Sequence, residues 1–137
     1  MRLAFALAAV LAFTTAAQAR TPLTERQSQF LEGMAKSIEG SLARRHARTG
    51  ARTFEPPKVT LDLPKRRLTI VNRFKQNPRG ADRRAVKTAL KDQQPELCLM
   101  FQSQALRKTD LSIVVRAELR SGSPIATVRA SPKLCPQ

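Results

Sequence analysis

Residues 111–120 read LSIVVRAELR, and residues 125–131 read IATVRAS. In the first stretch, apolar residues occupy every second position, namely Leu111, Ile113, Val115, Ala117 and Leu119. This period of two predicts a β-strand with one face in the protein core and the other mostly in contact with water. The sequence Ser-Gly-Ser-Pro at 121–124 predicts a turn, so we expect residues 125–131 to return as the partner strand.

Two further strands are predicted upstream of this hairpin. Val59, Leu61 and Leu63 alternate with polar residues, and another strand is expected at 67–74 after a short turn at 64–66. Residues 97–101 read LCLMF, a compact apolar run that fits either a buried helical turn or a short strand.

A first helix is predicted at 21–48 from apolar residues at helical spacing. Its start can be capped by Thr21 and Pro22, or by Thr24 with Gln27 three residues later. The apolar stripe of this helix consists of Leu31, Met34, Ile38 and Leu42.

A second helix is predicted from Asp82, a good N-cap residue, to about Gln93. One side of it is apolar, and the opposite side carries Arg83, Arg84, Lys87 and Lys91. The element order is therefore α-β-β-α-β-β. We expect an α+β domain in which two helices cover one face of a mainly antiparallel, four-stranded sheet.

The first nineteen residues have the features of a secretory signal peptide. Arg2 precedes the apolar run 3–13, and Ala17-Gln18-Ala19 gives the small-x-small pattern that signal peptidase cleaves. The apolar run is too short to span a membrane. We therefore predict cleavage between Ala19 and Arg20, and a single exported domain at 20–137 in the periplasm or outside the cell.

The chain has two cysteines, Cys98 and Cys135. In an oxidising compartment, an even pair in a small domain predicts one disulfide. Two free thiols, or pairing between molecules, are the alternatives.

The charge balance is strongly basic, with 25 Lys and Arg residues against 10 Asp and Glu residues and a net charge of +15. Removal of residues 1–19 takes away only Arg2, which leaves +14. Outside the cytoplasm, such a charge favours lipopolysaccharide, anionic membranes, acidic polysaccharides, released DNA or acidic protein patches as partners. The alternative is that the charge serves solubility. The candidate polyanion-binding residues are Arg44, Arg45, Arg83, Arg84, Lys87 and Lys91.

Catalytic and metal-binding motifs are not found in the sequence. The one histidine, His46, lies in a basic cluster without a carboxylate to orient it, and we interpret it as a surface residue. Asp62 and Glu118 are expected to form surface cross-strand ion pairs with Arg67, Arg116 or Arg120. We predict no enzyme activity, no cofactor and no metal site.

Specific recognition of nucleic acid is not expected for an exported protein. The chain beyond residue 19 has no Tyr or Trp, and its four Phe residues are expected in the core, which leaves no stacking platform. These residues are Phe30, Phe54, Phe74 and Phe101.

From Leu68 onward, the order of elements resembles the disulfide-bonded, β-rich class of type II secretion pilotins. The matching features are the strand 68–72, the Gly80 loop, a helix that leads to Cys98, the strand 111–120 and the terminal Cys135. Pilotins are small periplasmic lipoproteins that chaperone secretin subunits to the outer membrane. The chain departs from them in having Arg20 where they carry a lipid-modified cysteine, and Val71 where they have an aromatic residue.

This resemblance implies a protein-binding module that serves a secretion-system or envelope component. A partner peptide would lie between the first helix and the sheet, or along a sheet edge by strand addition. The alternatives are a secreted cationic factor that binds polyanions such as lipopolysaccharide, anionic membrane or DNA, and a virulence-associated factor or inhibitor. An inhibitor would present the loop 75–81 or 121–124.

Overall fold

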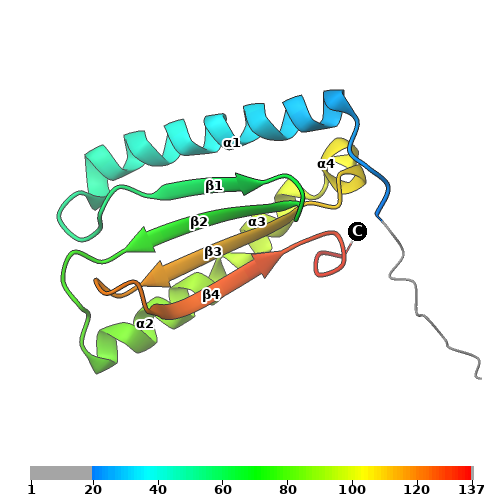
Figure 1. Ribbon diagram of the computed structural model, residues 1–137. Helices are drawn as coiled ribbons and strands as arrows, with labels where there is room; N and C mark the ends of the chain where they lie inside the picture. The colour runs from blue at the N-terminus through cyan, green and yellow to red at the C-terminus, as the bar shows by residue number, and fades with distance from the viewer. Residues whose placement is uncertain (1–19, 137) are drawn as a thin grey trace, which may run out of the picture.

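A four-stranded sheet in the order β1-β2-β3-β4 forms the centre of the computed structural model, which describes residues 20–136. The predicted signal peptide and its cleavage site lie outside the described residues. Figure 1 shows the sheet with β1 beside the long first helix and β4 at the opposite edge. The strands are β1 (Lys58–Asp62), β2 (Arg67–Arg73), β3 (Ser112–Glu118) and β4 (Pro124–Ala130).

The two outer strand pairs are antiparallel, whereas β2 and β3 are parallel. The α+β class and the four strands are confirmed, but the sheet is mixed, and the prediction of a mainly antiparallel sheet missed its central pair. The central pair is parallel because the long connection at 74–111 carries the chain back to the end of the sheet where β2 began. Parallel neighbours require such a crossover, and alternation within a strand does not report its direction.

The first helix, α1 (Glu25–Arg45), begins at a capping box. The Thr24 hydroxyl accepts a hydrogen bond from the Gln27 N–H at 3.1 Å, and the Gln27 side chain accepts one from the Thr24 N–H at 3.0 Å. Of the two predicted caps, Thr24 with Gln27 is therefore the one used. A π-helical turn, η1 (His46–Gly50), follows α1 directly.

The second helix, α2 (Gly80–Asp92), begins two residues before the predicted N-cap. Asp82 thus lies within the first turn, where its carboxylate faces the positive end of the helix dipole. The ambiguous apolar run is helical and belongs to α3 (Gln94–Met100). A short helix that was not predicted, α4 (Gln104–Lys108), is capped by Ser103.

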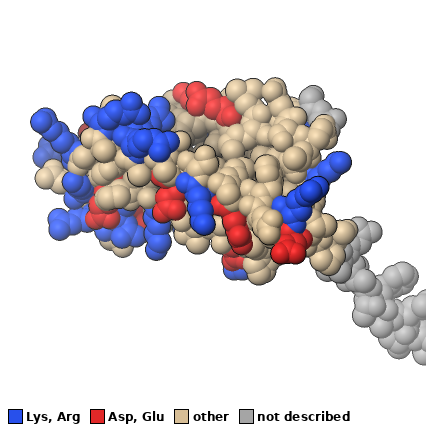
Figure 2. Space-filling model, turned by 90° about the horizontal axis from the view of Figure 1, so that it is seen from above, with Lys and Arg blue, Asp and Glu red and all other residues tan. Residues whose placement is uncertain are grey.

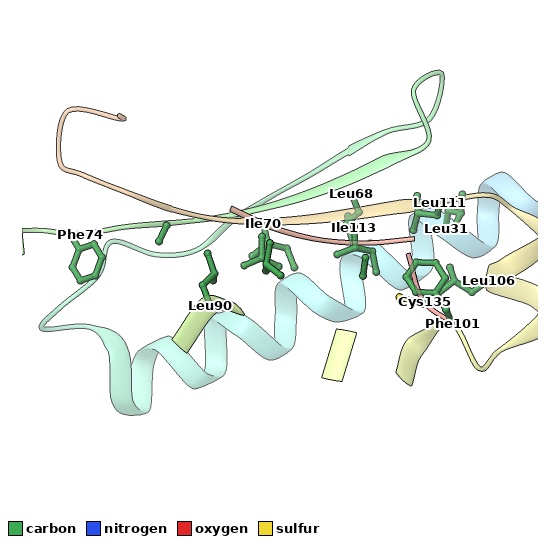
Figure 3. Close-up of a cluster of buried hydrophobic side chains, with 14 residues drawn as sticks. Leu31, Leu68, Ile70, Phe74, Leu90, Phe101, Leu106, Leu111, Ile113 and Cys135 are labelled. Atoms are coloured by element: carbon green, nitrogen blue, oxygen red, sulfur yellow. The ribbon is translucent and has the colours of Figure 1, made fainter. Parts of the chain in front are cut away.

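Helices cover one face of the sheet, and the core lies between the two layers. Leu68, Ile70 and Ile113 project from the sheet toward the helices, as Figure 3 shows. They pack with residues from α1 and from the crossover at 74–111. Two of these residues, Leu31 of α1 and Phe101 of the crossover, are fully buried. This one-sided core follows from the alternation in the strands, because successive side chains point to opposite faces. Phe30 is 41% exposed, so the expectation of a core position is wrong for this residue.

The other face of the sheet is free of helices in Figure 1. Residues of the opposite parity lie on it, among them Thr69, Val114 and Arg129, which are in register on three adjacent strands. The hairpin between β3 and β4 turns at Gly122, whose φ of 92° is a conformation that other residues rarely adopt.

The predicted disulfide between Cys98 and Cys135 is present, with a Cα–Cα distance of 5.2 Å. It joins α3 to the segment beyond β4. Arg107 of α4 reinforces this connection, because its guanidinium donates to the carbonyl oxygens of Phe101 at 2.6 Å and Cys135 at 2.7 Å. The C-terminal segment is therefore fixed to the crossover by one covalent bond and by hydrogen bonds.

Replacement of one cysteine, Cys98→Ser, should lower the melting temperature by about 10–20 °C. The disulfide closes a loop with a sequence separation of 37. A loop of that length contributes about 3–4 kcal/mol through the lost entropy of the unfolded chain. Circular dichroism with and without reductant measures the effect.

The matched control is the double variant Cys98→Ser, Cys135→Ser. Reductant should destabilise the wild-type protein and leave the double variant unchanged. A wild-type melting temperature that is independent of reductant would show that the disulfide does not support the fold.

Candidate functional site

A groove with a volume of about 710 Å³ lies on the helical side of the molecule, and we call it the central groove. The C-terminal half of α1 and the turn η1 contribute one wall, and α2 and α3 contribute the other. Its floor consists of Ile70 and Asn72 from β2 and Val115 from β3. The parallel pair of strands therefore forms the bottom of the groove.

Apolar side chains of α1 are only partly covered where they approach this groove. Leu31, near the start of the helix, is fully buried, whereas Ile38 and Leu42 are half-buried. Leu42 lines the groove together with Leu97 of α3. Covering such surface is favourable by about 25 cal/mol per Å² of apolar area removed from water. An apolar segment of a partner can supply that cover.

The two walls of the central groove carry opposite charges. Arg45 belongs to the wall formed by α1, while Asp92 and Glu96 belong to the wall formed by α2 and α3. Among the residues that the structure describes, no ion pair joins these walls. Both charged walls thus remain available to a ligand.

His46 lies at the start of η1 and is half-buried rather than fully exposed on the surface. Its Nε2 atom is 2.8 Å from the Phe54 carbonyl oxygen, which fits an Nε2–H donor. This hydrogen bond connects the end of α1 to the segment before β1. The histidine therefore shapes the mouth of the groove, and its engaged nitrogen is not placed to act as a base.

Lysine and arginine residues gather at one end of the molecule, the left end in Figure 2. In Figure 1, this end is where α1 finishes, α2 begins and the β3–β4 hairpin turns. The segments 44–55, 73–84 and 116–122 meet there, and we call this region the basic end. They hold eleven Lys and Arg residues against three Asp and Glu residues, a net of +8 out of the +15 of the whole chain.

The six residues predicted to bind polyanions divide into two groups in the structure. Arg44 and Arg45 lie in the last turn of α1, and Arg83 and Arg84 lie in the first half of α2, so all four belong to the basic end. Lys87 and Lys91 lie further along α2, beside β4. Four of the six thus lie at the same end of the molecule.

One carboxylate at the basic end is neutralised within the sheet. Glu118 is 5% exposed, and its Oε2 atom lies 3.1 Å from Nη2 of Arg73. Its Oε1 atom lies 3.7 Å from Nη1 of Arg116. Arg116, one of the expected partners, does pair with Glu118, but both residues belong to β3. The cross-strand partner is Arg73 of β2, which was not predicted, and Glu118 is buried rather than at the surface. Asp62 instead accepts a hydrogen bond from the Lys65 N–H at 3.0 Å.

Residues 20–136 contain neither a metal-binding cluster nor a helix that could cross a membrane. No three His, Cys, Asp or Glu side chains come together there in a way that suits a metal ion. Within the same part of the chain, no helix combines the length and the apolar character needed to cross a membrane.

Comparisons with known protein families, with curated proteins and with solved structures give no match to this chain. The resemblance to pilotins therefore remains a prediction from the order of elements and the position of the cysteines.

The sequence did not predict the basic end as a whole. It placed a partner peptide between the first helix and the sheet, but it did not predict the walls and floor of the central groove. The basic end and the central groove both depend on which ends of the helices and strands lie together, and the parallel pairing of β2 with β3 determines this arrangement. The available signal was the frequency of Arg and Lys in the turn η1 and in the loops, at Arg48, Arg52, Lys75, Arg79 and Arg120.

Proposed function

We propose that this protein is a non-enzymatic binding module, which takes an apolar segment of a partner protein into the central groove. The observation that carries the proposal is the apolar lining of the groove, in which the half-buried side chains of Leu42 and Leu97 stand above a floor that includes Ile70 and Val115. An amphipathic helix that lies in a groove uses such a surface. The oppositely charged walls would orient the segment.

The proposed location is the periplasm or the outside of the cell, with a secretion-system or envelope component as the partner. The disulfide supports an oxidising compartment, because cytosolic thiols are kept reduced. The signal-peptide pattern of residues 1–19 and the resemblance to pilotins point the same way.

A bulky residue inside the groove should prevent partner binding without unfolding the protein. Ala89 of α2 is exposed and lines the groove, so Ala89→Arg fills space that is otherwise open to solvent. Ala85→Arg is the matched control, because Ala85 is exposed one turn earlier on the same helix and does not line the groove.

Both variants and the wild-type protein would be used to capture partners from envelope and culture-supernatant fractions. The salt concentration would be low in one series and about 0.15 M in the other. The expected result is a defined protein that survives the higher salt and is captured by the wild type and by Ala85→Arg, with at least about tenfold less on Ala89→Arg. Equal capture by both variants, at equal melting temperatures, would reject the central groove as the binding site.

The gathering of arginines at the basic end favours a second candidate function, binding of a polyanion such as lipopolysaccharide, an anionic membrane or released DNA. Neutralising several phosphate or sulfate groups gives an affinity that falls steeply with salt. Recovery of polyanions alone, lost as salt rises, would favour this function over protein binding.

Reversal of three charges at Arg79, Arg83 and Arg84 to Glu should weaken heparin binding by about tenfold or more if the basic end is the site. Elution from heparin resin along a salt gradient measures the effect. The control reverses Lys65, Lys108 and Lys133, which gives the same change of net charge. They belong to the β1–β2 turn, to α4 and to the segment after β4, and these segments lie at the opposite end of the molecule in Figure 1. If both triple variants elute alike, the binding depends on net charge, and the basic end is not a specific site.

A further inference from the structure

The outer side of β4 has backbone groups that the sheet does not use. Ser112 donates its N–H to the Arg66 carbonyl, and Glu118 accepts from the Phe74 N–H, so residues of even number in β3 bond to β2. The odd-numbered residues of β3 therefore bond to β4, and Val115 and Ala117 pair there with Val128 and Ala126.

The backbone groups of Ile125, Thr127 and Arg129 consequently point away from the sheet, because the direction alternates along a strand. One of them has a partner: the side-chain amide of Gln94 donates to the Arg129 carbonyl oxygen at 3.1 Å. This bond confirms the outward direction at Arg129. At the opposite edge of the sheet, α1 lies along β1 in Figure 1, and at this edge α2 and α3 pack against β4.

A groove with a volume of about 450 Å³ follows the outer side of β4, and we call it the edge groove. It is lined by residues 125–129 of the strand and by Lys87, Leu90, Lys91 and Gln94 of the helical layer. Leu90 is 5% exposed, so the bottom of the groove is apolar and continuous with the core. The groove thus combines outward-facing peptide groups with a helix beside them.

The charges in the edge groove all have one sign. Lys87, Lys91 and Arg129 line it without an acidic residue, and none of the ion pairs between described residues involves them. Residues four apart on a helix are separated by about 5–6 Å, and alternate side chains of an extended strand by about 6–7 Å. Two acidic side chains on one face of an added strand would therefore lie opposite Lys87 and Lys91.

We propose that β4 accepts an extended, acidic segment of a partner protein as a fifth strand of the sheet. Main-chain hydrogen bonds to Ile125 and Thr127 hold the segment, and the two lysines select acidic residues at alternate positions. This site is separate from the central groove, and the inference stands whether or not that groove binds a partner. It gives Lys87 and Lys91 a role different from that of the arginines at the basic end.

Amide hydrogen exchange with a synthetic probe tests the proposal. The probe is a short capped peptide that alternates valine with glutamate, and the comparison peptide alternates valine with lysine, both at about 0.15 M salt. The expected result is slower exchange of the Thr127 and Ile125 amides with the glutamate peptide only. Unchanged exchange at these amides with millimolar glutamate peptide would overturn the proposal, and the cations would then only shield the edge from other strands.

Two variants test separately the contribution of the main-chain hydrogen bonds and that of the lysine charges to peptide binding. Thr127→Pro removes an outward N–H that the sheet does not use, which edge strands tolerate, and it should abolish peptide binding. The double variant Lys87→Glu, Lys91→Glu should weaken binding by about tenfold or more. The control Lys36→Glu, Lys133→Glu changes the net charge equally at exposed positions away from the groove. Unaltered binding by Thr127→Pro, or equal losses in the two charge variants, would overturn strand addition at β4.

Discussion

The parallel pairing of β2 with β3 is the constraint on which the rest of this structure depends. Parallel neighbours require the chain to return to its starting end, so residues 74–111 form a crossover. The crossover places α2, α3 and α4 in one layer, and that layer buries the side chains of Leu68, Ile70 and Ile113. The same pairing makes β1 and β4 the edges of the sheet. The disulfide then joins the crossover to the segment that follows β4.

The surfaces with a proposed role follow from this topology. Because β2 and β3 run in the same direction, both finish where α2 begins and α1 ends, and their flanking loops bring the arginines together. The central groove lies over these two strands, and the edge groove lies on the other side of α2. One helix therefore borders all three surfaces. Basic residues that the sequence places on the same side of α2, such as Arg84 and Lys91, therefore belong to different surfaces, the basic end and the edge groove.

Local features of the fold could be predicted from the sequence, and the arrangement of the elements could not. The strand expected at 111–120 is found at Ser112–Glu118, and the Thr24–Gln27 capping box is present, because each has a pattern within a few neighbouring residues. The disulfide is present as well, and it could be predicted because the chain has only two cysteines. The direction of β3 relative to β2 leaves no such pattern. The helix α4 is too short to predict from periodicity, and its Leu106 is held by burial in the core. The basic residues were accordingly predicted as a set of charges, and a partner peptide could be placed only broadly, between the first helix and the sheet or along a sheet edge.

Amide hydrogen exchange of the unliganded protein, followed by NMR, tests the topology most directly. Slow exchange is expected at Ser112 and Phe74, whose N–H groups donate across the parallel pair at 2.8 Å and 3.0 Å. Fast exchange is expected at Thr127 on the free edge of β4. Rapid exchange at Ser112 and Phe74, together with protection of Thr127, would contradict the parallel pairing, the free edge and the surfaces that depend on them.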